Sequence, residues 1–594
     1  MTASAGLNEN NNTEQDLREP LLSQQQEGDD VPVPVTCSNS SSRDGDVEAP
    51  SSCSSASVCP TTNNNDANNT PTQPAAFSYK TELLEMMNLG LPLAVSFFCR
   101  MGMASTDSAF VGHIHDDQNS PETYLAAAVL SDMVVNVCIT PPLAFNQVLN
   151  ALVGQAMGSG NPKMAGVWLQ QSMVWLSLSM APCLVFLFYV TPILKFLNFP
   201  DDVSQVAGTY AKFNLLWPIP NGLYQCMRFY FQAQGLPRPA MYNNLLFLFV
   251  NAVLNWTFVF GGPVPGWNGF GFIGAAISLS ISRTLQPLLY YLYMFVYKQH
   301  HKNTWPEDGW SLQHHTAART KEFMKQSIPN IGTLLFQAVA GQATTVLVGR
   351  LGELSIAASS ALSTVTIPWS GTLSASCVTI SGVRVGYHLG RGDAQSAKKT
   401  AWLVVHFITV VMIAVAVVFV PLQHSILTVA TDDHDVLHMA ATLVPAMLVG
   451  TYLNLIVGNI TSGVFSGMGR PFIATLLSFG LELPMSIGGV AIYILVMHGN
   501  LIGVYWWQAI SGGLEAIIVI VIMVRSNWDV CVQEALQRQE ADTATHPPQD
   551  GSSSNNEEER LPLTRGETAE MTSEDDSNTG DEAQEEQEQV QAVP

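Results

Sequence analysis

The most constraining feature of the sequence is a series of long apolar stretches between about residues 85 and 525, separated by short polar turns. Each stretch has about 20 residues, the length that a helix rising ~1.5 Å per residue needs to cross the hydrocarbon core of a bilayer. The sequence therefore predicts an all-α membrane protein with twelve transmembrane helices. The expected cores of these helices are 88–112, 124–148, 165–190, 205–228, 239–260, 271–297, 327–349, 356–380, 400–421, 437–463, 472–497 and 501–524.

The charge of the chain is concentrated at its two ends. The net charge is −23, and residues 1–79 and 540–594 carry −9 and −14 of it, so the apolar middle is neutral. Both ends are rich in Asn, Ser, Gln, Glu and Pro and contain few large apolar residues, which is typical of disordered segments. We expect disordered tails at 1–79 and 529–594. The polar start has no basic residue followed by an apolar stretch, so no cleavable signal peptide is expected.

No motif in the chain points to catalysis or to a bound metal. The nine cysteines include no CxxC pair, and six of them lie among apolar segments, where cysteine usually acts as a small hydrophobe. Neither HExxH nor GxSxG occurs, and no paired aspartates stand at positions typical of an intramembrane protease. We therefore expect no catalytic residue, metal site, disulfide framework or cofactor, and partners other than nucleic acid.

The distribution of lysine and arginine predicts the orientation in the membrane. An even number of crossings puts both tails on one side. Loops after even-numbered spans carry twelve Lys or Arg residues and loops after odd-numbered spans carry two, Lys195 and Arg350. Because short cytoplasmic loops are enriched in these residues, both tails are expected in the cytosol. The plasma membrane and a vacuole-like membrane remain open alternatives.

The two halves of the apolar region share a set of motifs at a nearly constant offset. GQAMGSGNPKMA (154–165) matches GYHLGRGDAQSA (386–397), 232 positions later, and FQAQG ending at Gly235 matches FSGMG ending at Gly469. These matches indicate a tandem duplication of a six-helix unit. The predicted parts are an N-lobe at 80–298, a cytosolic loop at 299–326 and a C-lobe at 327–528.

The paired glycine motifs follow the second helix of each lobe. We expect their glycines to allow close approach of neighbouring helix ends and to form turns, with Asn161 and Asp393 capping the following helices. A phosphate-binding loop is not expected, because neither motif ends in Gly-Lys-Ser/Thr. The glycines concerned are Gly154, Gly158, Gly160, Gly386, Gly390 and Gly392.

Two six-helix lobes of equal orientation imply a pseudo-two-fold axis along the membrane normal, an architecture that suits alternating access. The motifs, taken in their order along the two lobes, resemble those of the multidrug and toxic compound extrusion family. Members of this family are cation-coupled antiporters with two six-helix lobes. The resemblance covers about 85–525. The motifs on which the resemblance rests are MASTDSAFVGHI, GQAMGSGN, VNAVLNWTFVFG, GFIGAAIS, GVRVG, GYHLGRGD and FSGMGRP.

Ionisable residues inside hydrocarbon are costly, so each is a functional hypothesis. Away from the span ends we identify Asp107, Asp132, Glu482, Glu515 and Arg100. The resemblance implies that an aspartate placed as Asp107 couples transport to cations. It also implies hydrogen-bonding partners at Asn251 and Asn255, where relatives carry Asn and Asp; the amide at Asn255 weakens the case for sodium.

Other groups could complete or compete with this site. Tyr210 and Ser278 begin their spans at the outer side and are candidates for the same polar cluster. Arg100 lies two helical turns before Asp107, so an internal ion pair between them is an alternative or additional role. Asp132 could be a functional acid or an acid near the aqueous mouth.

The second lobe departs from the vertebrate and plant branches of the resembling family, which carry functional glutamates in helix 7. The matching positions are Gln337 and Gln342, which cannot titrate. Proton loading in this lobe would need another group. Glu482 and Glu515 are the candidates, although each could instead be satisfied by a serine or a backbone carbonyl.

The function expected from these observations is a monomeric antiporter among membrane lipids, exporting small organic, often cationic, compounds in exchange for protons. Sodium is the less favoured coupling ion. A lipid-linked saccharide flippase is the first alternative; it would be expected to have a strongly basic cavity, whereas the basic residues of this chain are concentrated in the expected cytosolic loops. A receptor or scaffold is the second alternative.

Overall fold

The computed structural model describes residues 77–114, 121–197, 199–263, 265–431 and 433–545, and the regular structure within them is helical. The first half contains α1 (Tyr79–Gly112), α2 (Pro121–Gly158), α3 (Pro162–Leu187), α4 (Val190–Phe196), α5 (Asp201–Phe213), α6 (Pro218–Ala233), α7 (Arg238–Phe260), α8 (Gly271–Tyr291), η1 (Leu292–Tyr297) and η2 (Leu312–His314). The second half contains α9 (Ala317–Gly349), α10 (Glu353–Gly390), α11 (Ala394–Leu427), α12 (His434–Gly458), η3 (Asn459–Phe465), α13 (Pro471–Leu477), η4 (Ser478–Glu482), η5 (Pro484–Gly489), η6 (Ile492–Val496), α14 (Leu501–Arg525) and α15 (Trp528–Thr545).

These helices account for twelve membrane spans. Ten helices of the described chain, some continued by π-helical turns, are long and apolar enough to cross a membrane. An eleventh span is α10, which has 38 residues and is rich in serine and threonine. The twelfth is divided into α5 and α6, because the chain leaves the helix at 214–217 and resumes at Pro218, whose ring cannot donate a backbone hydrogen bond. The predicted twelve-helix fold is confirmed.

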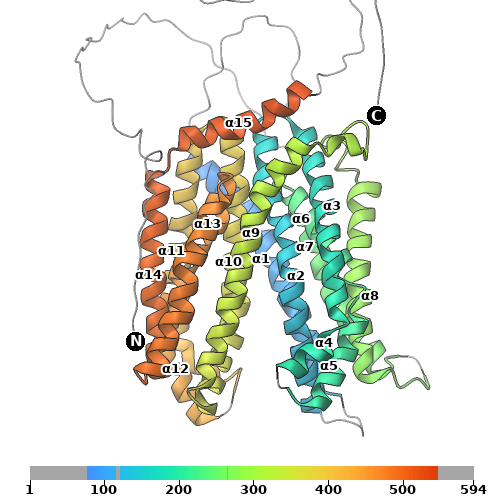
Figure 1. Cartoon of the computed structure of the whole chain (residues 1–594), viewed down its shortest axis with the longest axis vertical. Coiled ribbons are helices and arrows are strands. Elements are labelled where there is room, and N and C mark those ends of the chain that lie inside the picture. Colours follow the sequence, from blue (N-terminus) through green and yellow to red (C-terminus); the bar gives the residue numbers. More distant parts are fainter. Residues whose placement is uncertain (1–76, 115–120, 198, 264, 432, 546–594) are drawn as a thin grey trace, which may run out of the picture. The chain divides into compact units, whose positions relative to one another are not determined.

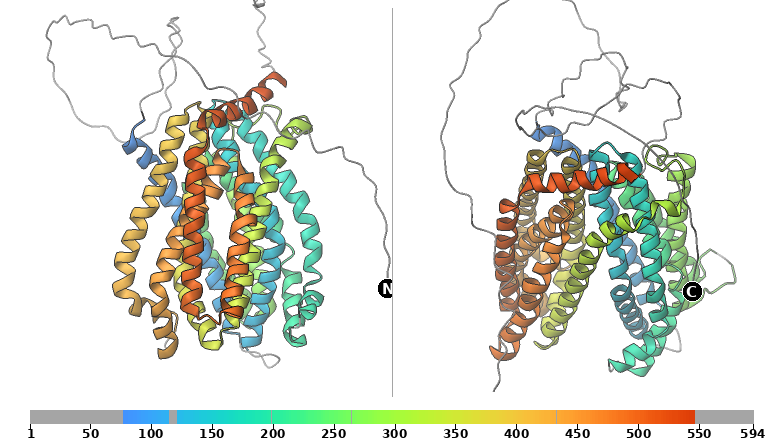
Figure 2. Two further views of the ribbon diagram at one scale, coloured as in Figure 1. Left: turned by 60° about the vertical axis from the view of Figure 1, so that its left-hand side comes forward. Right: turned by 45° about the horizontal axis from the view of Figure 1, so that its top comes forward.

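Corresponding helices pack alike in the two lobes. In the N-lobe α1 lies against α7, and in the C-lobe α9 lies against α13, the corresponding pair. Between the lobes, α2 packs on α9 and α10. Figures 1 and 2 show the lobes meeting near α15 and diverging toward the opposite end of the bundle. We call these the α15 end and the distal end.

Glycines of the duplicated motifs let α2 and α10 meet at the α15 end. A Cβ added to Gly154 would stand 2.8 Å from the carbonyl oxygen of Val383, and one added to Gly386 would stand 3.0 Å from that of Ala151. At Gly158 and Gly390 an added Cβ would overlap a backbone carbonyl of the facing helix. Two helix backbones can pass this closely only where side chains are absent.

The turns after these helices need glycine for a second reason. Gly160 and Gly392 have φ angles of 77° and 85°, a conformation that other residues rarely adopt. The capping prediction is correct at one turn only. Asp393 accepts hydrogen bonds from the backbone N–H of Ser396 at 2.9 Å and from its hydroxyl at 2.5 Å, whereas Asn161 makes no side-chain cap. Partial burial opposes ionisation of Asp393, but these bonds hold its pKa below the usual range.

Two predicted boundaries are wrong. The inter-lobe loop was expected to reach residue 326, but α9 begins at Ala317, where the hydroxyl of Thr316 caps it by accepting from the Arg319 N–H at 3.3 Å. The C-terminal tail was expected to be disordered from residue 529, but α15 occupies Trp528–Thr545. The remaining predicted tail residues, 1–76 and 546–594, lie outside the described part of the chain.

Helix α15 is anchored to both lobes by an amphipathic face. Trp528, Cys531, Val532 and Ala535 recur at helical spacing and are buried in the largest apolar core. Arg538, on the same helix, donates to Gln155 of α2 at 2.8 Å and pairs with Glu322 of α9 at 2.9 Å. In Figure 1 the helix lies across the end of the bundle. A short, half-polar helix of this kind resembles a tail in composition, which explains the error.

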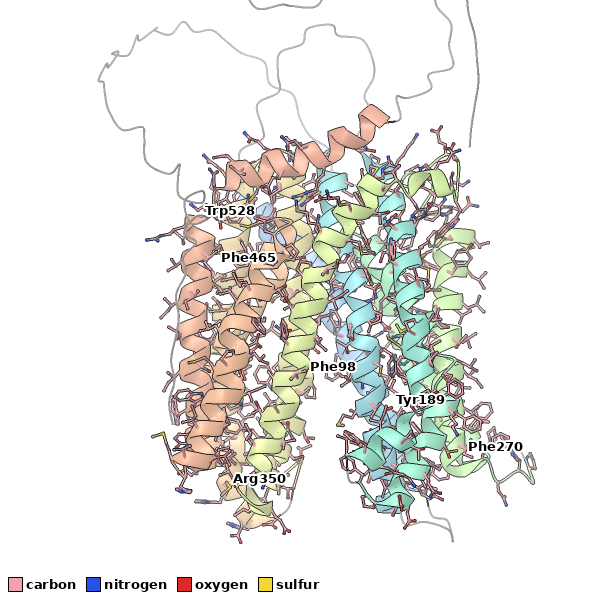
Figure 3. The ribbon with its side chains drawn as sticks, viewed as in Figure 1. Phe98, Tyr189, Phe270, Arg350, Phe465 and Trp528 are labelled. Atoms are coloured by element: carbon pink, nitrogen blue, oxygen red, sulfur yellow. The ribbon has the colours of Figure 1, made fainter. Side chains whose placement is uncertain are left out.

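The outer surface of the bundle is apolar. Large side chains project outward from both lobes, and Tyr189 and Phe270 of the N-lobe are 57% and 54% exposed (Figure 3). Phe465 and Trp528, by contrast, are buried between helices. Exposed apolar surface of this extent marks a membrane-facing protein.

Candidate functional site

Asp107 of α1 is the acceptor at the centre of a hydrogen-bonded cluster in the N-lobe. The side-chain amides of Asn251 and Asn255, both on α7, each donate to its Oδ1 at 2.7 Å. The two asparagines lie four residues apart and therefore on one face of the helix, and both are fully buried. The structure thus joins by hydrogen bonds three of the five residues predicted for cation coupling.

The cluster leaves two buried amide oxygens without hydrogen-bond partners. Because the amide nitrogens of Asn251 and Asn255 point at Asp107, the Oδ1 atoms of both asparagines have no hydrogen-bond partner in the described part of the chain. Buried acceptors without donors are rare in proteins. A proton on the carboxylate, or a small cation, is the kind of species that such an arrangement of oxygens can receive.

Asp132 and Tyr210 belong to the same electrostatic neighbourhood, whereas Ser278 does not join the hydrogen bonds. Asp132 on α2 interacts electrostatically with Asp107, and Tyr210 on α5 interacts with both acids. Tyr210 is buried and its ring packs 4.9 Å from that of Phe272. Ser278 on α8 is fully buried, and its hydroxyl has no partner among the described residues.

The alternative pairing of Arg100 with Asp107 is not formed. No ion pair joins them in the described structure, and the Nη1 of Arg100 has no hydrogen-bond partner there. The basic side chain that acts electrostatically on Asp107 is Arg283 of α8.

The sequence concentrates its basic residues in the expected cytosolic loops, with Arg100 inside a span, but the structure places two further arginines in the interior of the N-lobe. Arg228 of α6 and Arg283 of α8 are only 2% and 9% exposed, inside the N-lobe. The predicted fourth span, 205–228, ends at Arg228, but α6 begins at Pro218 after the break and continues to Ala233, so Arg228 lies inside it. Arg283 stands in the middle of the predicted span 271–297, so its position in the membrane was visible in the sequence, although it was not among the ionisable residues singled out there.

In the C-lobe, the two candidate glutamates lie near each other. Glu482 ends η4, Glu515 is buried in α14, and the charge of Glu482 acts on Glu515. Ser478 and Gln337 are hydrogen-bonding neighbours of Glu482. Gln337, one of the two glutamines of α9 that stand where relatives carry glutamates, therefore faces the C-lobe acid. The side chain of Gln342 lies outside the described part of the structure.

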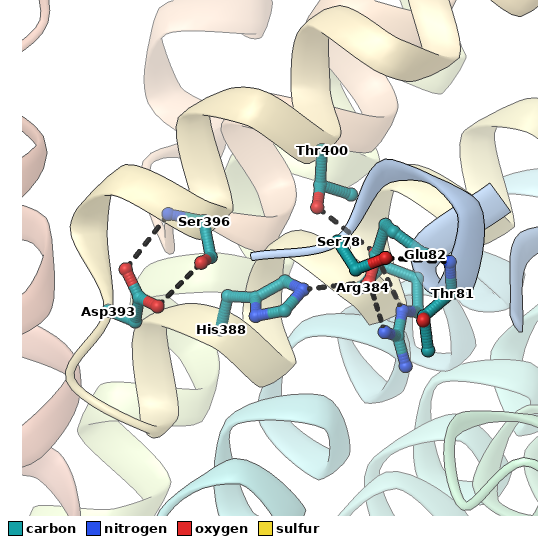
Figure 4. A network of polar contacts seen from close by, with 8 residues as sticks. All are labelled: Ser78, Thr81, Glu82, Arg384, His388, Asp393, Ser396 and Thr400. Atoms are coloured by element: carbon teal, nitrogen blue, oxygen red, sulfur yellow. Dashed lines mark hydrogen bonds and ion pairs between the residues drawn. The ribbon is translucent and has the colours of Figure 1, made fainter. Parts of the chain in front are cut away.

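A second polar cluster, which sequence reasoning did not find, joins the lobes at the α15 end (Figure 4). Glu82 of α1 accepts from Arg384 of α10 at 3.0 Å and 2.5 Å and from Thr400 of α11 at 3.0 Å. His388 lies 3.2 Å from the same carboxylate. Glu82 is 5% exposed and borders a cavity of about 560 Å³ lined by both lobes. No local motif signals a contact between residues 302 positions apart.

We expect Glu82 and Arg384 to stabilise the closed α15 end as a pair. In a double-mutant cycle with Glu82→Gln and Arg384→Gln, the coupling energy should be about 2 kcal/mol, because each single change leaves its partner buried and without an opposite charge. Denaturation in mixed micelles of the wild type, the two single variants and the double variant gives the free energies from which this coupling energy is calculated. Thr400→Val, which removes one hydrogen bond to the carboxylate but neither charge of the pair, is the control and should cost about 1.5 kcal/mol. Additive effects of the two single changes would show that no such pair operates.

The fold and the site together define a class of protein. Two parallel six-helix lobes, an acid held by amides inside one of them and close helix packing at one end constitute the architecture of a multi-pass membrane transporter. The MatE family model matches residues 92–257 and again residues 329–487, one match in each lobe. The chain belongs to the MatE family.

Individual relatives agree with this assignment. The chain is 25% identical over 467 residues to Multidrug and toxin extrusion protein 1 of Homo sapiens, with 77% of each chain covered. It is 24% identical over 460 residues to Protein DETOXIFICATION 38 of Arabidopsis thaliana, covering 77% of this chain and 87% of the relative. The crystal structure of the eukaryotic MATE transporter AtDTX14 has a TM-score of 0.69 and 20% identity, over 77% of this chain and 99% of that one.

Proposed function

We propose that the protein is a secondary active antiporter that exports small organic molecules, often cationic, in exchange for protons. Membership of the MatE family and relatives named for multidrug and toxin extrusion support export of such compounds. The single observation that carries proton exchange is the carboxylate of Asp107, held inside the membrane part by the amides of Asn251 and Asn255. A carboxylate in that environment is available for loading and release of a proton as the lobes move. The proton gradient supplies the energy, and no cofactor is needed.

The composition of the N-lobe cluster favours protons over sodium. Only one carboxylate, Asp107, receives hydrogen bonds from the cluster, and Asn255 contributes a neutral amide where an acid would add a second negative charge. Hard cations prefer several oxygen ligands with substantial negative charge. Arg283 adds a positive charge in the neighbourhood, which further disfavours a bound metal cation.

The proposed cycle alternates access between the two ends of the bundle. The α15 end is closed by the contacts of Gly158, Gly390 and Glu82, while the lobes diverge at the distal end. Loop lysines and arginines support a cytosolic α15 end, with both termini in the cytosol. In the proposed cycle this arrangement corresponds to a state closed toward the cytosol, and opening toward the cytosol requires the α2–α10 contact and the Glu82 cluster to separate. We propose a monomer surrounded by lipid, in the plasma membrane or a vacuole-like membrane.

Of the alternatives, the flippase has one observation in its favour. Its expected basic interior is partly met by Arg100, Arg228 and Arg283. The Asp107 cluster and the MatE match favour the antiporter. For a receptor or scaffold, a buried acid with two amide donors would have no role.

The experiment that tests the proposal uses sealed vesicles containing the purified full-length protein and a fluorescent organic cation. A proton gradient or a sodium gradient of equal size is imposed with the membrane potential clamped at zero. We expect the proton gradient to drive accumulation and the sodium gradient to have no effect. Accumulation driven by the sodium gradient alone would overturn the proposal. A flux of the organic cation that is the same with and without the proton gradient would also overturn it.

A further inference from the structure

The N-lobe contains three arginines inside its helix bundle that the proposed proton exchange does not use: Arg228 and Arg283 are buried, and Arg100 is half-buried. Arg100, Arg228 and Arg283 come from α1, α6 and α8, and Arg100 is close enough to both others for their charges to interact. In the described part of the chain, none of the three forms a salt bridge, and the Nη1 of each is buried without a hydrogen-bond partner. Arg100 therefore lies near two further guanidinium groups, and each of the three has an unused donor.

An uncharged hydrogen-bond network centred on Asn244 joins the helices that carry these arginines. Asn244 of α7 accepts from Tyr224 at 3.0 Å and from Gln286 at 2.8 Å, and it donates to Ser96. Ser96 lies one helical turn from Arg100, Tyr224 one turn from Arg228 and Gln286 one turn from Arg283. The arrangement is thus built by α1, α6, α7 and α8 together.

Contacts around Arg228 hold its guanidinium in place without neutralising it. Its Nε donates to Gln225 at 2.9 Å, and its plane stands 4.8 Å from the ring of Phe97 and 4.4 Å from the ring of Phe229. Aromatic faces attract a cation but carry no net charge. The free Nη1 and the neighbouring hydroxyl of Tyr290, which also lacks a partner in the described structure, remain available as donors.

The carboxylates near the three arginines are too few to neutralise their positive charge. Arg283 interacts electrostatically with Asp107 and Asp132, but the groups that act on Arg100 and Arg228 include no carboxylate. Arginine stays charged in proteins, so these groups cannot become neutral by losing a proton. Whenever Asp107 is protonated, the imbalance grows. Buried charge without compensation is strongly unfavourable, and an anion from outside the chain would relieve it.

We propose that Arg100, Arg228 and Arg283 form a binding site for the acidic group of an organic anion, a carboxylate or sulfonate attached to an aromatic body. Guanidinium groups bind such planar oxyanions through paired hydrogen bonds, and Phe97 and Tyr290 border the site as aromatic surfaces. The inference deepens the proposed function by adding acidic and zwitterionic compounds to its substrates, and it rests on that function for its physiological meaning.

The test compares two dyes with a common xanthene core, fluorescein as the anion and rhodamine 6G as the cation. Binding to full-length protein in neutral micelles is followed by fluorescence anisotropy without any gradient, so failure of proton coupling cannot affect the result. We expect Arg228→Gln and Arg283→Gln each to weaken fluorescein binding by roughly tenfold, while rhodamine 6G binding is kept or strengthened. Arg350→Gln, at an exposed helix end, is the matched control and should change neither.

Two further arms separate folding defects and lipid binding from the proposed site. Arg283→Lys keeps the charge but loses the paired donors, so its affinity for fluorescein should lie between those of the wild type and Arg283→Gln. Thermal unfolding checks that each variant is folded. Adding phosphatidylglycerol, with phosphatidylcholine as the control, tests for a lipid headgroup. Fluorescein binding that is absent, or equal in all variants, would overturn the proposal. Strong displacement by phosphatidylglycerol alone would also overturn it and would assign the arginines to a lipid phosphate.

Discussion

Asp107→Asn should reduce proton-driven accumulation of an organic cation by roughly a hundredfold while leaving the protein folded. An asparagine at this position keeps an oxygen that can accept from Asn251 and Asn255, so the local hydrogen bonds survive. It removes the group that exchanges a proton. Initial rates in vesicles under an imposed pH gradient, with the membrane potential clamped, measure the effect. Downhill exchange of labelled substrate without a gradient should persist, because alternation of the lobes does not require the charge.

Glu482→Gln provides the matched control for this result. It makes the same carboxylate-to-amide change in the C-lobe, beside Gln337 and near Glu515. If the N-lobe cluster alone couples transport to protons, this variant should keep most of its gradient-driven rate. Equal losses in Asp107→Asn and Glu482→Gln would contradict the assignment of coupling to the first lobe.

Gly158→Ala should destabilise the closed α15 end by about 3 kcal/mol or more. The new methyl group would overlap the carbonyl oxygen of Tyr387, a backbone atom that cannot rotate away, so α2 and α10 would have to separate. Gly390→Ala should act similarly, because its methyl group would meet the carbonyl of Gln155. Denaturation midpoints report the stability, and thiol labelling of a single cysteine introduced beside Glu82 reports the opening. We expect a lower midpoint and faster labelling.

Gly341→Ala is the control for both glycine changes. It lies inside α9, and a Cβ built there meets no atom within 4 Å. Alanine favours helix over glycine by about 1 kcal/mol, so this variant should be neutral or slightly more stable. A neutral Gly158→Ala would show that the two helices do not pack as closely as the structure indicates.

The membrane architecture was predictable because its signals are long and repeated. Each apolar stretch of about 20 residues identifies a span independently of the others, and the duplicated glycine motifs fix the division into lobes. The cluster of Asp107, Asn251 and Asn255 was predictable from the resemblance, together with the one-turn spacing of the two asparagines.

Features that depend on distant partners could not be predicted. Glu82 meets Arg384 across 302 positions; Arg384 stands in the GVRVG motif, but nothing in that motif indicates its partner. The burial of Arg228 depends on where α6 begins after the break in the fourth span. Helix α15 has a polar composition, and what distinguishes it from a tail is the packing of Trp528 and Cys531 against the bundle. In each case tertiary contacts, rather than local composition, decide the role of the residue.

Direct counting of protons is the measurement that tests proton exchange most closely. A pH-sensitive dye outside the vesicles and a labelled organic cation report both fluxes at once, with no sodium present and the membrane potential held at zero. The wild-type protein should move protons opposite to the substrate in a fixed ratio, and Asp107→Asn should move substrate downhill with no accompanying protons. Substrate flux in the wild type without any proton movement, or an unchanged proton-to-substrate ratio in Asp107→Asn, would contradict proton exchange through Asp107.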